Sequence, residues 1–562
     1  MSTENTDANT LLQRALAYFA QGNYEEAISQ AEQLIQACQF LGESEHLLAA
    51  SLHSLGRSDE ALAHAKRAIV EEGANPSFLN TYGVILRKLK RVNEAIRSYH
   101  CVSQLQPDFA DVYYNCGNAH MELKQLAEAV EQFSLCLKYR PNHNSAHHNI
   151  ANALRDLKRI DEALEHYQQS SEAEFHNPDM HCNWGLAWQL KERWERAISC
   201  FETAIQQKTD HVPSHINLGS ALAVQERFSE ACAALRRGVE LDDTCLDAKF
   251  NLGLTLLTIG EFDEGWRFYD TRLQLPDKVR SPLSSPIWDG DLELKSPLLV
   301  WAEQGYGDNI QFVRYIPLLM ELGLDVVLST RKPLMELFKH CLQPSCPPVV
   351  EHKPSELQGF EHHVPLLTLP RILCTNLQTI PRMPGYFRVP SPIPQQLTIH
   401  RQPFALQVGL VWASGVDNKD MYADKSMPLA PLMSILDQFR DLKLLSLHSL
   451  QVGVDASQLN PWHGQWGITD WSNRVHSFFD TAKVISQLDL VITVDTAVAH
   501  VSGALNKPTW LLLQHNADFR WLRGRDDSPW YPSMTLFRQS TLGDWTSVLS
   551  NVCDRLSFLL GR

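Results

Sequence analysis

Small and apolar positions recur with a fixed period through the first half of the chain. A small residue returns every 34 positions, and a second small residue follows twelve positions after each of these. The first series is Ala15, Ala49, Gly83, Gly117, Ala151, Gly185, Gly219 and Gly253. The second series is Ala27, Ala61, Ala95, Ala129, Ala163, Ala197, Ala231 and Gly265. A sustained period of this length is typical of a repeat architecture.

A larger apolar residue follows in most repeats, one helical turn after the second small residue. Tyr99, Phe133, Tyr167 and Phe201 lie at this position. Where two antiparallel helices cross, small residues let the backbones approach, and a larger side chain fills the neighbouring gap. The pattern therefore predicts two helices per repeat and an α-solenoid of about eight repeats over residues 8–275. The repeat resembles the tetratricopeptide repeat, and this resemblance implies that the solenoid holds another protein chain.

Asparagine recurs two residues before the small residue in five successive repeats. The series is Asn115, Asn149, Asn183, Asn217 and Asn251. Its predicted place is the first helix of each hairpin, on the concave side of the solenoid, where a carboxamide can both donate and accept hydrogen bonds. The series is similar to the asparagine ladder of the O-linked N-acetylglucosamine transferases. We predict that it binds the backbone of an extended peptide; the alternative is a contact between neighbouring repeats.

The pattern changes after the last repeat. Residues 276–296 contain several prolines and serines and predict a linker. From residue 297, short apolar runs alternate with helical stretches, which predicts parallel sheets covered by helices. The predicted strands are Leu298–Ala302, Asp325–Ser329, Val408–Ala413, Leu442–Leu447, Leu490–Val494 and Thr509–Leu513. The predicted helices are Asn309–Leu322, Pro333–Cys341, Pro431–Phe439, Phe478–Leu488, Thr496–Leu505 and Asp544–Leu560.

A proline-rich stretch at 381–403 divides this α/β region into two unequal parts. We expect a first Rossmann-like lobe at 297–395 and a second, ligand-binding lobe at 396–562. Two such lobes facing a cleft are found in many enzymes that use nucleotide sugars, although a fold alone does not define a function.

Composition narrows the function classes. The net charge of -15 and the pI near 5.8 argue against a sequence-independent nucleic-acid binder, which needs a basic surface. No stretch approaches the roughly 20 apolar residues of a membrane span, and the polar start has no signal-peptide pattern, so we expect a cytoplasmic protein. The 12 cysteines form no C-x-x-C pair, which predicts reduced thiols and no metal site. The pair His362–His363 is expected at the surface.

The first candidate site follows the first predicted strand of the α/β region. Gly305, Gly307 and Asp308 stand between that strand and the next helix. Ligands of α/β proteins bind at the carboxyl ends of strands, and glycines allow close approach of another molecule. The alternative is that Asp308 only caps its helix.

The second and third candidate sites also follow predicted strands. Asp495 ends one strand, Thr496 and Ala497 open the next helix, and His500 lies one turn further on. The free N–H groups of such a helix start favour a pyrophosphate, although a structural cap is the commoner role. Ser414 and Lys425 lie in a loop after another strand, where a hydroxyl and an ammonium group suit phosphate oxygens; a solvated lysine is the alternative.

A fourth segment, 518–534, is dense in arginine and aromatic residues, among them Arg520 and Trp521. Two interpretations stand open for it. The cluster closes over a base or sugar, or it forms a salt-bridged packing surface.

The order of these motifs is more specific than any one of them. G-x-G-D opens the first lobe, V-G-L-V-W opens the second, and V-D-T-x-x-x-H and G-x-x-x-K-P follow. Together they resemble the ADP-heptose:lipopolysaccharide heptosyltransferases, and more closely the bacterial tetratricopeptide proteins with a heptosyltransferase-like GT-B module. The resemblance covers roughly residues 296–540.

This resemblance implies a role for each matching residue. Asp308 falls on the catalytic base, Lys425 on a phosphate-contacting lysine, and Asp495, Thr496 and His500 on the donor site. Ala497 stands where those enzymes have glycine, which leaves the donor sugar open. The implied reaction is an inverting, metal-independent transfer of a sugar from a nucleotide sugar to an acceptor hydroxyl, with no further cofactor.

Three hypotheses follow. The chain is a glycosyltransferase acting on a protein held by the repeats. Alternatively, the chain is a non-catalytic scaffold with a degenerate transferase-like domain, and Ala497 favours this hypothesis. In the third hypothesis, the same sugar transfer is made to a glycan or to a lipid-linked acceptor.

Overall fold

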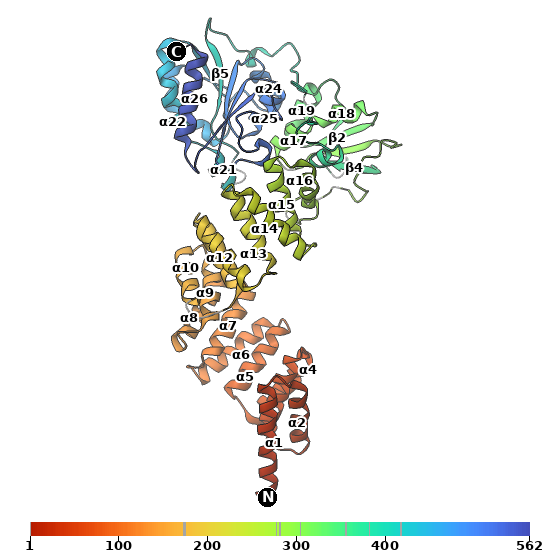
Figure 1. Ribbon diagram of the computed structural model, residues 1–562, viewed down its shortest axis with the longest axis vertical. Coiled ribbons are helices and arrows are strands. Elements are labelled where there is room, and N and C mark those ends of the chain that lie inside the picture. Colours follow the sequence, from red (N-terminus) through yellow and green to blue (C-terminus); the bar gives the residue numbers. More distant parts are fainter. Residues whose placement is uncertain are drawn as a thin grey trace. The chain divides into compact units, whose positions relative to one another are not determined.

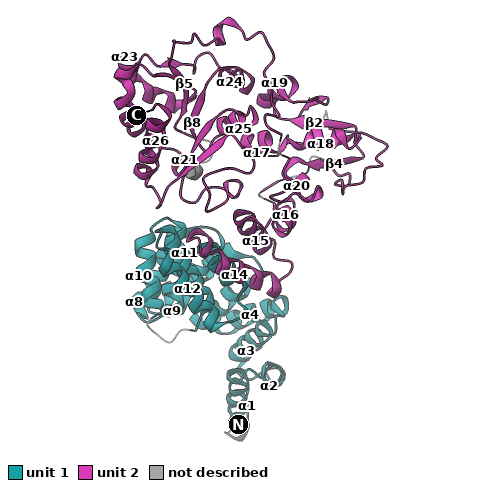
Figure 2. Cartoon of the chain, turned by 45° about the horizontal axis from the view of Figure 1, so that its top comes forward, with its two compact units in different colours: residues 1–221 teal, residues 222–562 magenta. Residues whose placement is uncertain are grey.

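The chain forms two compact units in a computed structural model that describes residues 2–171, 176–276, 278–279, 281, 283–303, 305–353, 357–381, 383–415 and 419–561. The first unit is Met1–Ala221 and the second is Leu222–Arg562 (Figure 2). Helices fill the described part of the first unit, and the second combines helices with two parallel sheets (Figure 1).

Sixteen helices in the described residues form the predicted series of helical hairpins. Those of the first unit are α1 (Ser2–Ala20), α2 (Tyr24–Gln36), α3 (Leu41–Ser54), α4 (Ser58–Glu72), α5 (Pro76–Lys88), α6 (Val92–Leu105), α7 (Ala110–Glu122), α8 (Leu126–Tyr139), α9 (Asn144–Asp156), α10 (Ile160–Ser171), α11 (Pro178–Leu190) and α12 (Trp194–Gln207). The series continues through α13 (Val212–Val224), α14 (Phe228–Leu241), α15 (Leu246–Ile259) and α16 (Phe262–Tyr269). The prediction of an N-terminal α-solenoid is confirmed.

The crossing of the two helices in each hairpin explains why a small residue recurs every 34 positions on the first helix. A Cβ atom added at Gly117 would lie 2.5 Å from the ring of Phe133, which is closer than real Cβ contacts. The same atom at Gly83 would lie 2.4 Å from the ring of Tyr99. The aromatic side chain therefore occupies the space that the missing side chain leaves free.

The turn between the two helices also repeats, with one residue in the left-handed region. Its φ lies between 55° and 65° in the five repeats where this residue carries a side chain. These residues are Lys90, Lys124, Lys158, Glu192 and Glu226, and glycines occupy the equivalent positions 22, 56 and 260. Left-handed backbone costs a residue with a Cβ atom about 1–2 kcal/mol, so five of the eight turns carry that cost.

The last helices of the series belong to the second unit (Figure 2). Trp266 of α16 is buried and packs edge-to-face on Phe312, Phe519 and Trp530, with ring centroids 5.8–6.4 Å apart. The division between units therefore falls inside α13, and the end of the solenoid shares a core with the α/β part.

A buried ion pair reinforces this junction. Arg272 lies in the short helix η1 (Asp270–Leu273) and binds both carboxylate oxygens of Glu303, at 2.7 and 2.9 Å. Each side chain is only 3% exposed. Arg272 also pairs with Asp270, whose other oxygen accepts from Arg371.

The first sheet is four-stranded and parallel, with the order β3-β2-β1-β4. Its strands are β1 (Leu298–Trp301), β2 (Val326–Thr330), β3 (Val349–Glu351) and β4 (His362–Pro365), and its helices are α17 (Tyr306–Phe312), α18 (Tyr315–Glu321), α19 (Lys332–Cys341) and α20 (Leu369–Ile372). The predicted helix Asn309–Leu322 is thus two helices. Pro317 has no N–H for the carbonyl of Val313, which removes one helical hydrogen bond at the break.

The second sheet is six-stranded and parallel, with the order β10-β9-β8-β5-β6-β7. Its strands are β5 (Leu406–Val411), β6 (Leu445–Ser449), β7 (Thr469–Asp470), β8 (Leu490–Val494), β9 (Thr509–Leu513) and β10 (Met534–Arg538), and its helices are α21 (Lys419–Lys425), α22 (Leu429–Leu436), α23 (His463–Trp466), α24 (Phe478–Ile485), α25 (Ala497–Ala504) and α26 (Trp545–Leu559). Numbered from β5, the order is 3-2-1-4-5-6, that of doubly wound nucleotide-binding folds.

Helices cover both faces of this sheet because successive residues of a strand point to opposite sides. Ile492 of β8 packs in one core with Leu432 of α22 and Val552 of α26. Its neighbour Val491 packs in the other core with Val501 of α25. The sheet is therefore buried on both faces, as parallel sheets generally are.

Four strands, β3, β4, β7 and β10, were not predicted, and the expectation that the pair His362–His363 lies at the surface was wrong for His363. His363 lies in β4 and is fully buried, accepting from Trp301 Nε1 at 3.0 Å and lying 3.0 Å from the carbonyl oxygen of Ser285. These partners come from other elements, so neighbouring residues gave no sign of them. Among the described residues, no helix combines the length and apolar character that a membrane span requires.

Candidate functional site

The candidate residues of the α/β part gather where strands of the two sheets end. β5 and β8 are neighbours in the second sheet, and the strand order reverses between them. Ligands of doubly wound folds bind outside the carboxyl ends of the strands at such a point. β8 leads directly to Asp495, whereas Lys425 is the last residue of α21, the helix that follows β5, and does not lie in a loop as predicted.

Lys425 and Asp495 meet at this point. The Nζ atom of Lys425 lies 2.7 Å from Oδ2 of Asp495, and their side chains are 12% and 3% exposed. Burial disfavours both charges, but the pair outweighs it, so the pKa of Lys425 is raised and the pKa of Asp495 is lowered. The structure thus holds a fixed ammonium group at the switch point of the sheet.

Asp308 lies in the first turn of α17, after β1. Gly305 precedes this helix with φ 86°, and a Cβ atom there would lie 2.6 Å from Oδ2 of Asp308. Burial raises the pKa of Asp308 to about 6, even though the cations of Arg520 and Lys425 favour its ionised form. Because 26% of its side chain is exposed, this carboxylate is accessible and suited to take up a proton near neutral pH.

Arg520 links Asp308 to the second sheet. It lies in the short helix η7 (Phe519–Trp521), and its Nη2 donates to Oδ1 of Asp308 at 2.5 Å. Its Nη1 lies 2.8 Å from Oδ2 of Asp518. The guanidinium side chain is only 8% exposed, so the structure places a second buried cation beside Asp308 and Lys425.

Asp518 was missed in the sequence. It also caps η7 by accepting from the Arg520 N–H at 3.2 Å. The signal available was its place two residues before an arginine in a loop after a strand, which is too common to single out one carboxylate.

His500 is buried in α25 and is held on three sides. Its Nδ1 lies 2.9 Å from the hydroxyl of Tyr531, and its ring stacks on Trp521 at 5.3 Å. A Cβ atom at Gly307 would lie 2.6 Å from this ring, so the glycine allows α17 to approach α25. Burial, with Arg520 nearby, lowers the pKa of His500 to about 3. His500 is therefore neutral at pH 7 and contributes a polar contact rather than a positive charge.

The aromatic residues of the fourth segment lie inside the core. Trp521, Trp530 and Tyr531 are each at most 2% exposed. Of the two interpretations of this segment, this arrangement favours the packing surface for its aromatic residues. Arg520 is the member of the segment that joins Asp308, Lys425 and Asp495 in the ion-pair cluster.

Ser414 and the start of α25 flank the cluster. The N–H of Ser414 donates to Oγ of Ser426 at 3.0 Å, and its hydroxyl lies 3.4 Å from the same atom. Thr496 is the N-cap of α25, but its side chain makes no capping hydrogen bond; its hydroxyl lies 3.3 Å from that of Thr493. Ala497 is the first residue of the helix.

The asparagines of the solenoid contact neighbouring repeats. Asn115 donates to Asn80 at 3.0 Å, and Asn149 donates to Asn118 at 2.8 Å. Asn183 accepts from Arg155 at 3.0 Å, and Asn217 donates to the sulfur of Cys182 at 3.2 Å. Asn251, like the other four, is half-buried. Each carboxamide has more donors and acceptors than these bonds use, so a contact between repeats does not conflict with peptide binding.

Comparison with known families identifies the repeats. The tetratricopeptide repeat matches residues 9–38, 35–67, 110–143, 145–172 and 187–244, and the TPR repeat matches residues 83–124. The N-terminal half of the chain is therefore a tetratricopeptide-repeat region, and such repeats indicate a protein or peptide partner.

Among curated proteins, the chain is similar to Protein FlbA of Caulobacter vibrioides. The two are 23% identical over 332 residues, which cover 53% of this chain and 53% of FlbA. The chain thus matches only about half the length of that relative.

Solved structures similar to this chain include YrrB, described as a TPR protein with an unusual peptide-binding site (19% identity, TM-score 0.30, 33% of this chain and 95% of that one). PilF of Pseudomonas aeruginosa is 21% identical with a TM-score of 0.35, over 37% of this chain and 96% of that one. The Cut9–Hcn1 hetero-tetramer of the APC/C is 16% identical with a TM-score of 0.36, over 47% and 52%.

Proposed function

We propose that the chain is a glycosyltransferase that moves a sugar from a nucleotide-sugar donor to a hydroxyl group of a polypeptide held by the repeats. The observation that carries the proposal is the meeting of Asp308, Arg520, Lys425 and Asp495 at the strand ends of two parallel sheets. This arrangement combines an accessible carboxylate with two buried cations. A direct displacement needs the carboxylate to accept the proton of the acceptor hydroxyl, and the cations to stabilise the leaving nucleoside diphosphate.

Asp308 is the general base of the proposed reaction. It takes the proton of the acceptor hydroxyl as the hydroxyl oxygen attacks the anomeric carbon, and the bond to the diphosphate oxygen breaks with inversion. A base works best when its pKa lies near the working pH, and a pKa of about 6 leaves Asp308 mostly ionised at pH 7.

Lys425, Arg520 and the first amides of α25 stabilise the leaving diphosphate. Both cations are held by carboxylates, so their positions are fixed before the reaction begins. Charges that are already oriented need no rearrangement as negative charge grows on the leaving group. When phosphate oxygens take the place of Asp308 as the partner of Arg520, the base is released for the acceptor.

The second candidate function is a protein-interaction scaffold with an inactive α/β part. The tetratricopeptide-repeat matches and the inter-repeat hydrogen bonds of the asparagines are consistent with it. Ala497 favours it as well, because a methyl group at the start of α25 narrows the approach to the helix amides.

The first function is tested by incubating the purified chain with a panel of nucleotide sugars, with and without cell lysate as the source of acceptor. The release of nucleoside diphosphate is measured. We expect release from one donor, and its loss in Asp308→Asn with donor binding kept. The matched control is Asp544→Asn, since Asp544 caps α26 away from the cluster and asparagine caps equally well. No release from any donor supports the scaffold instead.

The role of the asparagines is tested separately. Replacing Asn115, Asn149 and Asn183 by alanine is expected to weaken binding of an extended peptide while circular dichroism keeps its helical signal. Asn142→Ala, at an exposed turn, is the control. Unchanged peptide affinity in the triple variant contradicts this role.

A further inference from the structure

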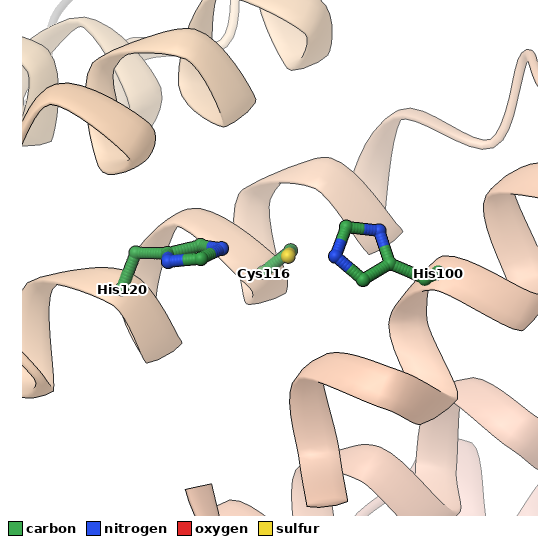
Figure 3. Close-up of side chains that lie close together, drawn as sticks. All are labelled: His100, Cys116 and His120. Atoms are coloured by element: carbon green, nitrogen blue, oxygen red, sulfur yellow. The ribbon is translucent and has the colours of Figure 1, made fainter. Parts of the chain in front are cut away.

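Two histidines and a cysteine meet between the third and fourth helical hairpins, far in sequence from the cluster around Asp308. Cys116 and His120 lie one turn apart on α7, and His100 lies on α6 (Figure 3). One possible ligand atom from each residue lies within 4.8 Å of the other two. In Figure 3 both imidazole rings turn toward the thiol.

A bound metal would draw these three ligand atoms closer together. Bond lengths of 2.0–2.3 Å to nitrogen and sulfur set neighbouring ligand atoms of a tetrahedral Zn²⁺ ion about 3.5 Å apart. His100 is exposed, so we expect rotation of its side chain to shorten the remaining distance. It also leaves one side of the cluster open to solvent, which provides a route for the ion.

A supporting contact orients His120. Its Nδ1 lies 2.8 Å from Oε1 of Gln125. An Nδ1–H that donates to this amide oxygen leaves the lone pair of Nε2 available to a metal, which is how histidine ligands are usually held. No motif predicted this cluster, because the three residues lack the C-x-x-C spacing of common zinc sites.

We propose that His100, Cys116 and His120 form a Zn²⁺ site that ties α6 to α7, with the fourth position open to water or to a group of a bound partner. Two imidazoles and a thiolate are a ligand set that suits this borderline-soft ion. Binding breaks the S–H bond of Cys116 and releases its proton to solvent, and the sulfur electron pair forms the bond to the metal. No oxidant or reductant takes part.

The burial of Cys116 bears on this step. Its side chain is buried among apolar residues, where a thiolate without a positive partner is disfavoured. The ion itself must therefore drive the loss of that proton, as metals do when thiols coordinate them.

A Co²⁺ titration tests the proposal. The full chain is first stripped of metal with a chelator, and Co²⁺ is then added in steps. A Co²⁺–thiolate bond gives a charge-transfer band in the near ultraviolet, and four-coordinate Co²⁺ gives strong visible bands. We expect both bands to saturate at one Co²⁺ per chain and to disappear when Zn²⁺ is added. Removal of one ligand is expected to weaken Co²⁺ binding by at least about tenfold.

Single substitutions distinguish a defined metal site from nonspecific binding of Co²⁺ to a thiol. His100→Gln and His120→Gln are expected to weaken binding, and Cys116→Ser to abolish the thiolate band. Because Cys116 is buried, the exposed His100 provides the decisive variant if Cys116→Ser does not fold. Cys101→Ser is the control, since Cys101 is exposed and adjacent to His100 in sequence, and it is expected to keep the bands.

Three results overturn the proposal. They are absence of a thiolate band at one equivalent of Co²⁺, unchanged Co²⁺ affinity in His100→Gln and His120→Gln, and loss of the band in Cys101→Ser.

Discussion

The buried pair of Arg272 and Glu303 provides a quantitative test of how the last repeat is joined to the α/β part. We consider Glu303→Gln, which removes one charge and keeps the shape of the side chain. Glu303 binds Arg272 through both oxygens, and one of them also accepts from the N–H of Leu367 at 3.1 Å. Glutamine keeps one acceptor for these donors but leaves the arginine charge less compensated.

The expected cost follows from the burial of the pair. Removing one partner of a fully buried ion pair costs about 3–5 kcal/mol. Arg272 retains Asp270 as a partner, so we expect the lower end, about 3 kcal/mol. For a unit of this size the urea dependence is about 3 kcal/mol per M, so the midpoint of unfolding falls by about 1 M.

Urea unfolding followed by tryptophan fluorescence measures this shift, because most of the 14 tryptophans lie in the second unit. Arg272→Met combined with Glu303→Gln removes both charges and is expected to cost less than Glu303→Gln alone. Glu230→Gln, which breaks an exposed pair with Arg227 in the same unit, is the control and should leave the midpoint unchanged. A shift of less than about 0.3 M for Glu303→Gln would refute the reasoning that this pair holds the junction.

Three further predictions concern the site and the repeats. If Asp308 is the base, turnover requires its ionised form, so the rate rises with pH and reaches half its maximum near pH 6 in a pH–rate profile; a flat profile between pH 5 and 8 speaks against it. Gly117→Ala forces a methyl group against the ring of Phe133 and is expected to destabilise the first unit by about 1–3 kcal/mol in thermal unfolding, whereas Gly464→Ala, with no atom within 4 Å, should be neutral. Lys124→Gly relieves a left-handed turn and is expected to stabilise the first unit by about 0.5–1 kcal/mol, so a lowered melting temperature would contradict it.

The repeat region could be predicted in detail because its contacts are local and recur. The distance from Gly83 to Tyr99 along the chain is the same as from Gly117 to Phe133, and each pair is in contact. A contact that repeats at a fixed spacing leaves a periodic signal in the sequence. β8 and β9 were also predicted with the bounds that the structure shows, because each strand is apolar apart from one threonine.

The parts that were missed depend on contacts between distant segments. β4 begins with two histidines, and His363 is satisfied by Trp301 and Ser285, which lie far from it in sequence. The order of motifs indicated Asp308, Lys425 and Asp495 as candidates, but not that Arg520 would lie between the two sheets and pair with Asp308. Pairing of charges across elements is a property of the tertiary fold, and no spacing along the chain encodes it.

The placement of α14–α16 in the second unit has a consequence for how such a chain can change. A cut at the expected linker, after residue 275, would remove Trp266 and Arg272 from a core that needs them. The smallest fragment that keeps the α/β part intact therefore begins with repeat helices. A gain or loss of repeats at this end would therefore disturb the α/β core, and we expect the number of repeats to change elsewhere in the series.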